Sequence, residues 1–390
     1  MAIDKAQREQ ILESVDRLVR DKIAPRAAEI DARDEFPRDL YKAAAELGLF
    51  GLWIPEEYGG IGPDMVTPLL ISERIARVSA SFSLSFSNCG DACTPIVIGG
   101  SEALKRRFLP GIAAGEIIPA FCLSEPGGGS DAAAITTRAV RDGDHYVING
   151  RKMWITNGSI AGVYTIFAKT DPDAGHKGVS AFVVPRDTPG LVIGRDETLI
   201  GLHGSPTTEL TFENLRVPVA NRLGEEGEAF KIAMETLDEA RLNCSAMALG
   251  AATSAVEQSI AYAKERVQFG KPIIEHQGLQ FLVAEMATGL TAARALWKES
   301  IRKLERGRTR EASVHAGMAK LIATDVAMRV TTDAVQVFGA NGLSRNYPVE
   351  RLMRDVKAFQ IFDGTNQIQK MVIGRYCQKN GLPLEEGIDL

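Results

Sequence analysis

The sequence predicts an α+β protein of several domains, in which an α-helical N-terminal domain is followed by an antiparallel β-barrel and a C-terminal four-helix bundle. Three observations predict this class. Residues 4–114 show helical spacing of apolar side chains, residues 117–212 carry short β-rich runs, and helical spacing returns from residue 227 onward. We therefore expect domains at residues 1–115, 116–226 and 227–390.

Bulk composition restricts the class of protein. The chain has 390 residues, of which 45% are apolar and 24% charged, as in an ordinary globular protein. Its net charge of −5 argues against nucleic acid as a main partner. The N-terminus lacks an apolar stretch, and no run of about 18 apolar residues occurs, so we expect neither a signal peptide nor a membrane span.

The cysteines and histidines indicate no metal site. The five cysteines are odd in number and lie among apolar or small residues, which is typical of reduced thiols in a cytoplasmic protein. Cys89 and Cys93 have no matching Cys or His pair nearby, and the histidines form no cluster.

In the N-terminal domain, apolar spacing predicts a helix over residues 4–33, where Asp4 and Gln7 form a capping-box pattern and Pro25 interrupts the helix. Further helices are expected at 39–49, 65–79, 82–99 and 101–114.

The middle of the chain carries six β-rich runs, at residues 118–123, 145–148, 152–156, 164–168, 180–184 and 209–212. Asp142-Gly143 and Asn149-Gly150 are typical hairpin turns. Because no helical pattern separates the runs, we expect an antiparallel barrel or sandwich. Four long helical patterns then follow, at 228–264, 276–306, 311–339 and 348–379, and predict the bundle.

Two candidate ligand-binding segments lie at the ends of predicted β-strands. The Gly-rich segment 124–131 would let backbone amides approach a ligand closely, although it lacks the Gly-x-Gly-x-x-Gly spacing of a Rossmann loop and could equally be a surface loop. Trp154 ends another run and could cover an aromatic cofactor, with Thr156 on the same face. The alternative for Trp154 is a half-buried core residue.

The Phe-Asp-Gly turn at residues 361–369 carries the candidate catalytic group. Two helices that meet at a glycine can direct the Asp363 carboxylate into a cleft, where it could act as a catalytic base beside a flavin. The alternative role for Asp363 is to cap the helix that begins near Thr365.

Five segments in this order resemble the acyl-CoA dehydrogenase family. They are residues 121–131, 150–158, 266–272, 336–342 and 361–369, and the similarity covers nearly the whole chain. The resemblance implies the fold order described above, FAD as the cofactor, an acyl-CoA substrate, an electron-transferring flavoprotein as the electron acceptor, and a homotetramer built as a dimer of dimers.

The resemblance also assigns roles to individual residues. It implies flavin contacts at Phe121, Leu123, Ser124, Gly129, Ser130, Trp154, Ile155 and Thr156. It implies pyrophosphate and adenine contacts, donated across a dimer interface, at Arg266, Gln268, Phe269, Gln336, Val337, Gly339 and Ala340. It implies further FAD contacts at Thr365 and Gln367, and substrate contacts at Ser130, Asp238, Arg241 and Gly364. From the residues alone, Arg266 could instead form a surface ion pair, and Asp238 and Arg241 an intrahelical salt bridge.

The sequence departs from the family pattern at two acids. Asp363 stands where the family usually has the longer Glu, while Ala240 occupies the alternative position of the base in some members and cannot serve. Asp91 lies where members generally have an apolar residue along the acyl pocket. We interpret Asp91 as a second acid that acts on a carbon more distant from the thioester, as a cyclic acyl group would require. The alternative for Asp91 is a carboxylate turned to solvent or bonded to a nearby amide.

The predicted function is therefore FAD-dependent dehydrogenation of a short, branched or alicyclic acyl-CoA, such as a cyclohexane- or cyclohexene-carboxyl thioester. Two alternatives stay open. One is a flavoprotein similar to nitroalkane oxidases, which also use Asp as the base, and the other is a non-catalytic acyl-CoA-binding scaffold.

Overall fold

The computed structural model describes residues 3–383 and divides into two compact units, Met1–Ala240 and Arg241–Leu390. The protein is a helix-rich α+β structure with N-terminal helices, a central sheet and C-terminal helices, as the sequence predicts. The unit boundary falls inside one long helix, α7 (Ala229–Glu265). The three predicted domain ranges remain a prediction, and the ends of the outer two extend beyond the described residues.

The first helical segment confirms the predicted cap and interruption. Helix α1 (Lys5–Leu18) begins with a capping box in which the Asp4 side chain accepts from the Gln7 amide at 2.8 Å. The regular helix then gives way to a π turn and a 3-10 turn that contains Pro25, before α2 (Ala27–Arg33) resumes it. The other helices of this region are α3 (Arg38–Glu46), α4 (Val66–Ala76), α5 (Ala80–Gly99) and α6 (Glu102–Ala113).

Helix α5 is almost entirely buried and packs against α4, α6 and three strands of the sheet. The Ser79 side chain caps it by accepting from the Phe82 amide at 3.3 Å. A Cβ at Gly90 would come within 2.5 Å of the Trp53 ring, so only glycine fits this close contact. The packing of α5 therefore fixes the position of Asp91, which follows Gly90.

The central sheet contains eight strands among the described residues, in the order β6-β7-β3-β2-β4-β5-β8, with β1 paired to β4. The strands are β1 (Pro119–Cys122), β2 (Arg138–Asp142), β3 (His145–Thr156), β4 (Val163–Lys169), β5 (Val179–Pro185), β6 (Leu191–Asp196), β7 (Thr207–Pro218) and β8 (Arg222–Leu223). Over residues 3–383, no pairing joins β6 to β8, so the expected closed barrel is not found.

The pairing is also not purely antiparallel. Strand β4 pairs in parallel with β1 and, at one position, with β2. Strand β4 is buried along its whole length, with Tyr164 and Ile166 in one apolar cluster and Val163 and Phe167 in another. Both faces of the sheet are therefore covered at this strand.

Asn149-Gly150 was predicted as a hairpin turn, and this prediction is wrong. Both residues lie inside the continuous strand β3, where the register with β7 shifts between Ile148 and Gly150. Gly150 has φ of 148°, and a Cβ there would come within 2.5 Å of Thr137. Glycine at this position serves a β-bulge instead of a turn.

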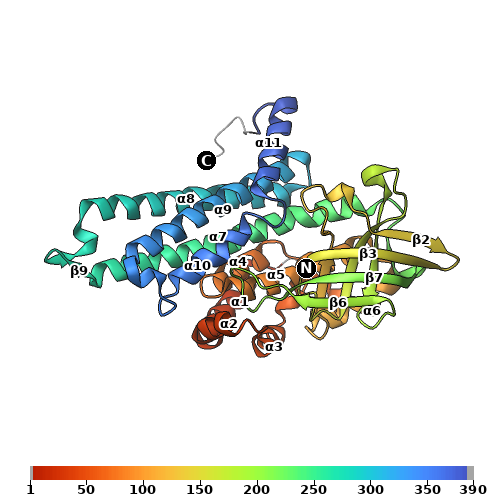
Figure 1. Ribbon diagram of the computed structural model, residues 1–390, viewed down its shortest axis with the longest axis horizontal. Coiled ribbons are helices and arrows are strands. Elements are labelled where there is room, and N and C mark those ends of the chain that lie inside the picture. Colours follow the sequence, from red (N-terminus) through yellow and green to blue (C-terminus); the bar gives the residue numbers. More distant parts are fainter. Residues whose placement is uncertain (1–2, 384–390) are drawn as a thin grey trace. The chain divides into compact units, whose positions relative to one another are not determined.

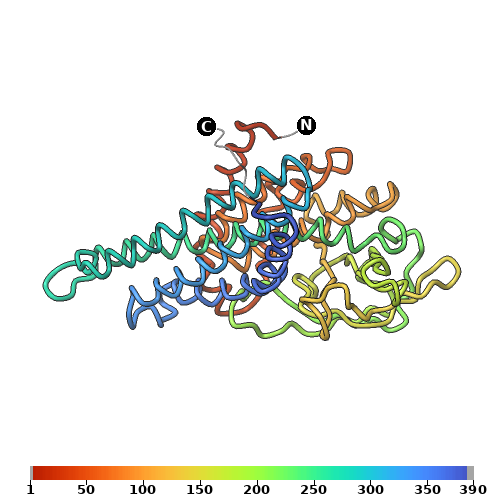
Figure 2. Tube along the Cα trace, turned by 90° about the horizontal axis from the view of Figure 1, so that it is seen from above, coloured from red at the N-terminus to blue at the C-terminus, as the bar shows by residue number. Residues whose placement is uncertain are grey.

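The second unit consists of packed helices and one small hairpin. Helix α9 (Arg310–Phe338) packs against α8 (Gln277–Arg306), α10 (Val349–Phe359) and α11 (Asn366–Asn380), and α8 runs alongside α9 in both views (Figure 1, Figure 2). Strands β9 (Val267–Gln268) and β10 (Lys271–Pro272) pair between α7 and α8. The last predicted helical pattern is thus two helices, and the arrangement as a four-helix bundle stays a prediction.

Short 3-10 segments connect these elements, at Leu49–Trp53, Glu56–Tyr58, Ala132–Ala134, Gly175–Gly178, Val219–Asn221, Ile273–Glu275 and Gly339–Leu343. The part of the chain that the structure describes contains no helix of the length and apolar character that a membrane crossing requires.

Candidate active site and cofactor segments

Asp363 lies in the turn between α10 and α11, and the structure excludes it as the helix cap. The N-cap of α11 is Thr365, whose hydroxyl accepts from the Ile368 amide at 3.2 Å. Asp363 itself adopts left-handed backbone with φ of 54°, and Gly364 follows with φ of 85°. This double left-handed turn lies between the end of α10 and the start of α11.

The Asp363 carboxyl is held in a desolvated, positively charged environment. Burial raises its pKa, while the charges of Lys320 and Arg241 lower it, and the result is a pKa of about 6. The Arg241 guanidinium also donates to the Asp363 carbonyl at 3.4 Å, and Arg241 is buried. A carboxylate with a pKa near the working pH can both accept and release a proton, as a catalytic base must.

The sequence reasoning did not identify three residues that surround this turn. Lys320, Asn366 and Gln369 are buried polar side chains, and each bonds to the turn or to the helix behind it. A signal was available in the helical spacing, because Lys320 falls among the alanines and valines of the buried face of α9. A lysine at such a position needs a partner.

In the first unit, the structure brings the two predicted flavin segments together. The Met153 amide donates to the Ser124 carbonyl at 3.0 Å, so the segment after β1 lies beside the end of β3. Phe121 lies on β1 with its ring 4.9 Å from that of Phe167, and Leu123 and Ile155 are buried. The two segments, separated by about 30 residues in the chain, form one surface.

A buried ion pair joins the same two segments. The Lys152 ammonium donates to a Glu125 carboxylate oxygen at 2.8 Å and to the Leu123 carbonyl at 2.9 Å. Glu125 also accepts from the amides of Thr136 and Thr137, at 2.6 and 3.0 Å. Burial raises the Glu125 pKa, but Lys152 and these donors lower it by more, so that the pKa falls to about 2. Burial lowers the Lys152 pKa to about 8, so both groups are charged near neutral pH.

Trp154 is not the half-buried core residue that the alternative interpretation requires. Its side chain is 55% exposed, and its φ of 64° lies within a second register shift of β3. Because this bulge breaks the alternation of the strand, the sequence spacing alone does not put Trp154 and Thr156 on one face. An exposed indole beside the Gly-rich loop is consistent with a surface that covers a planar cofactor.

The Gly-rich loop offers open space to a ligand. Glu125 and Gly128 exchange backbone hydrogen bonds of 3.0 and 3.1 Å, which folds the loop into a tight turn. A Cβ added at Gly127 or Gly129 would meet no protein atom within 4 Å, so the packing of the chain does not explain these glycines. Gly129 and Ser130 are exposed, and a 3-10 turn follows instead of a helix. The loop therefore fits close approach by a bound group.

In the second unit, five of the predicted nucleotide contacts line one hollow of about 240 Å³. These are Arg266, Gln268, Val337, Gly339 and Ala340. The hollow also contains Phe338 and Asn341, both in the segment 336–342 that resembles the family, and Tyr262 and Ile273, which the sequence did not indicate. Tyr262 and Phe338 stack with ring centroids 4.1 Å apart. An exposed guanidinium beside stacked rings suits a group that carries both phosphate and an aromatic base.

Not every predicted nucleotide contact lines this hollow. Phe269 is 94% exposed at the tip of the β9–β10 hairpin, and Gln336 and Gln367 are exposed as well. These roles therefore remain predictions.

The predicted CoA and second-acid residues lie on two buried helices. Asp238 and Arg241 occur three residues apart on α7, and both are buried. Asp91 is partly buried on α5, and its charge contributes to the raised pKa values of the Cys89 and Cys93 thiols, which burial raises most. Placing a carboxylate among such residues costs free energy unless it is paired or functional. The role of Asp91 as a second acid therefore stays a prediction.

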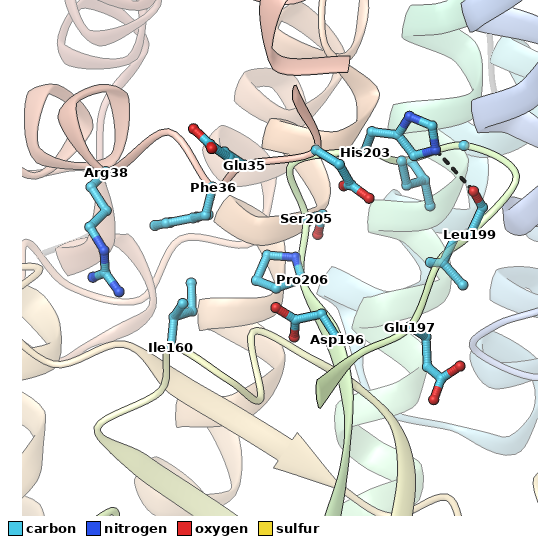
Figure 3. Close-up of a pocket in the computed structure, with 13 residues that line it drawn as sticks. Glu35, Phe36, Arg38, Ile160, Asp196, Glu197, Leu199, His203, Ser205 and Pro206 are labelled. Carbon is cyan, nitrogen blue, oxygen red and sulfur yellow. Dashed lines mark hydrogen bonds between the residues drawn. The ribbon is translucent and has the colours of Figure 1, made fainter. Parts of the chain in front are cut away.

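Another hollow, of about 290 Å³, lies in the first unit and contains none of the predicted site residues (Figure 3). His203 lies at its edge with Nε2 2.9 Å from the Leu199 carbonyl and Nδ1 2.9 Å from the Asp31 carbonyl. Burial lowers the His203 pKa, but these carbonyls and the Asp31 and Asp34 carboxylates raise it more. This histidine connects α2 to the loop before β7.

Family models for the N-terminal, middle and C-terminal domains of acyl-CoA dehydrogenase match residues 5–116, 120–215 and 227–377. A cyclohex-1-ene-1-carbonyl-CoA dehydrogenase of Geobacter metallireducens is 48% identical over 359 residues, which cover 91% of this chain and 93% of the relative.

Two solved structures share the fold. Butyryl-CoA dehydrogenase from Megasphaera elsdenii superposes with a TM-score of 0.92 at 40% identity, over 95% of this chain and 98% of that one. A chain in a structure of the electron transferring flavoprotein of Acidaminococcus fermentans gives a TM-score of 0.92 at 42% identity, over 96% and 98% of the two chains. These similarities show that the chain belongs to the acyl-CoA dehydrogenase family of flavin-dependent oxidoreductases.

Proposed function

We propose that the protein is an FAD-dependent dehydrogenase of a short, branched or alicyclic acyl-CoA, with Asp363 as the catalytic base. The observation that carries this proposal is the raised Asp363 pKa of about 6 between Lys320 and Arg241. The substrate class is supported by the similarity to a cyclohex-1-ene-1-carbonyl-CoA dehydrogenase.

In the proposed mechanism the Asp363 carboxylate removes a proton from the carbon next to the thioester carbonyl. When bound, FAD supplies the acceptor for the hydride that leaves the neighbouring carbon, so that a carbon–carbon double bond forms. Trp154, Thr156 and the Gly-rich loop would hold the flavin, and the hollow beside Arg266 would hold the nucleotide part of the FAD of a partner subunit, donated across a dimer interface. Asp238 and Arg241 bind the CoA moiety.

Asp363 is one methylene shorter than the glutamate usual in the family. A displacement of about 1 Å can cost on the order of a hundredfold in rate, so the shorter base implies a substrate carbon that lies closer to the turn. A compact ring next to the thioester carbonyl satisfies this requirement. Asp91 serves in this proposal as the second acid in the acyl site.

The electron acceptor in the proposal is an electron-transferring flavoprotein, supported by the similarity to a chain in such a structure. We further propose a cytoplasmic homotetramer, which is typical of the family.

The test is a panel of acyl-CoA thioesters, including butyryl-, isobutyryl-, cyclohexane-carboxyl- and cyclohexene-carboxyl-CoA, mixed anaerobically with the holoenzyme. We expect the cyclic thioesters to bleach the flavin fastest, and mass spectrometry to show loss of two hydrogens. Bleaching by nitroalkanes but by no thioester would instead support the nitroalkane-oxidase alternative. A colourless protein that binds CoA would support the scaffold.

A further inference from the structure

Lys320 is a lysine with no exposed surface, located in the middle of α9. Lysine is almost never fully buried unless it is paired, because the ammonium loses its hydration. Neighbouring groups must therefore supply the hydrogen-bond acceptors that water would otherwise provide. The acceptors lie at one place, the turn that carries Asp363.

The Lys320 ammonium bonds to this turn at two points. It donates to the Gly364 carbonyl at 2.9 Å and to the Asn366 side-chain oxygen at 2.9 Å. The Asn366 amide in turn donates to the Thr324 hydroxyl at 2.9 Å and to the Asp325 carboxylate at 2.7 Å, both on α9. The turn is thus fastened to one helix by a closed set of hydrogen bonds.

The backbone of the turn needs this support. A non-glycine residue with a left-handed backbone costs of order 1–3 kcal/mol and persists only where its surroundings over-determine it. Besides Lys320, Gln369 donates to the Asp363 and Gly364 carbonyls at 3.2 and 2.9 Å, and Arg241 donates to the Asp363 carbonyl. The conformation that orients the Asp363 carboxyl depends on these three side chains.

Lys320 also brings a charge. Lys320 on α9 and Arg241 on α7 are the positive groups that act on the Asp363 carboxyl, and both lower the pKa that burial raises. Burial likewise lowers the Lys320 pKa, Arg241 lowers it further, and Cys244, Asp363 and Asp325 oppose this. The position of Lys320 therefore combines two effects on the base, one through the backbone and one through charge.

We propose that Lys320 is a positioning residue for the dehydrogenation, one that fixes the turn presenting Asp363 and keeps its carboxyl ionised. This inference rests on the proposed role of Asp363 as the base. Lys320 contacts the turn, and its effect on the reaction passes through Asp363. A purely structural lysine would satisfy the Gly364 carbonyl without any influence on the ionisation of Asp363.

Two variants separate the two effects. Lys320→Gln keeps a donor for the Gly364 carbonyl but removes the charge, whereas Asn366→Leu keeps the charge but removes one anchor of the turn. Lys303→Gln is the control, because it neutralises another mostly buried lysine of this unit, which pairs with Glu311 at 2.8 Å.

The first readout needs no substrate. Infrared spectra of the holoenzyme, with Asp363→Asn as the reference that removes one carboxyl signal, give the pH at which Asp363 ionises. We expect this midpoint to move up by about one unit or more in Lys320→Gln, since a nearby opposite charge shifts a carboxyl by about 1–3 units. Asn366→Leu should move it less, and Lys303→Gln should leave it unchanged.

The second readout is the rate of flavin bleaching by an acyl-CoA at neutral pH. We expect roughly a tenfold to hundredfold loss in both Lys320→Gln and Asn366→Leu, with little change in thioester affinity. An unchanged infrared midpoint in Lys320→Gln overturns the proposal, as does Asn366→Leu with the wild-type rate. If no thioester bleaches the wild-type flavin, the proposed function fails, while the infrared titration still decides the effect of Lys320 on Asp363.

Discussion

The ammonium of Lys152 lies 2.8 Å from the carboxylate of Glu125, and both side chains are buried. Lys152 also donates to the carbonyl of Leu123, one of the predicted flavin contacts. Trp154, another predicted flavin contact, follows two residues after Lys152 in the chain. The pair therefore sets the spacing between the two strand ends that make the proposed flavin surface.

We expect Lys152→Met to lower the free energy of unfolding by about 3–5 kcal/mol, because it leaves the Glu125 carboxylate buried without its charge partner. The flavin should also dissociate more readily. Chemical denaturation and the flavin released on gel filtration measure the two effects. Arg151→Met is the matched control, since its neighbouring pair with Glu209 is exposed and should cost less than about 1 kcal/mol. Equal stability of the two variants would contradict the prediction.

Replacement of Asp363 should separate catalysis from folding. We expect Asp363→Asn to retain its flavin and its helix content but to lose flavin bleaching by at least about a thousandfold, since general-base catalysis contributes up to about 10⁴. Asp363→Glu should fold equally well and change the rate ratio between cyclic and linear thioesters. Stopped-flow bleaching and circular dichroism check both expectations, and an active Asp363→Asn would exclude this residue as the base.

The raised Asp363 pKa also has a consequence for stability. The folded state holds this proton more tightly than the unfolded state, whose carboxyl has an ordinary pKa near 3.8. The contribution of Asp363 to stability is therefore most favourable below that value and declines as the pH rises through about 6. Asp363→Asn should be more stable than wild type at pH 8, by on the order of 1–3 kcal/mol, and lose this advantage in acid. Denaturation curves across this range provide the measurement.

His203 predicts a pH dependence of the same sign in the first unit. Both of its ring nitrogens face carbonyl oxygens, and only the imidazolium form can donate to both. Because its pKa is raised above 6.5 on folding, its stabilising effect is complete below that pH and is lost as the pH rises through the folded value. His203→Gln should therefore reduce the fall in melting temperature that wild type shows as the pH rises above 6.5. His176→Gln, at an exposed histidine, should leave the curve as in wild type.

Asp91 is tested by a conservative change. We expect Asp91→Asn to slow flavin bleaching by cyclic thioesters about tenfold or more, and to affect butyryl-CoA less, because the proposed second acid acts on a carbon far from the thioester. Stopped-flow rates on both substrates give the answer. Identical rates on every thioester would leave Asp91 with a structural role only.

Local sequence signals predicted much of the helical structure. The Asp4–Gln7 capping box and the break at Pro25 occur as expected, since both depend on neighbouring residues. Asn149-Gly150 was misassigned because the same dipeptide suits a hairpin turn and a bulge, and only pairing with β7 decides between them. Strand β2 was missed because its arginines and aspartate obscure the alternation.

Long-range relationships could not be predicted from the residues themselves. The bond between Lys320 and Gly364 joins positions 44 residues apart, and nothing in either local pattern indicates the partner. The parallel insertion of β1 beside β4 is likewise decided by tertiary packing. The resemblance indicated Asp363 as a candidate base and most of the residues that line the hollow beside Arg266, but not Tyr262, whose stacking on Phe338 is visible only in the folded chain.

The cap of α11 at Thr365 bears on how this turn can vary. Because the hydroxyl of Thr365, and not the carboxylate of Asp363, satisfies the first free amides of the helix, the side chain two residues earlier is not needed to start α11. Exchange between aspartate and glutamate at 363 can therefore change the reach of the base without melting the helix. A lineage could thus adapt its substrate range by one substitution at this turn, with the fold left intact.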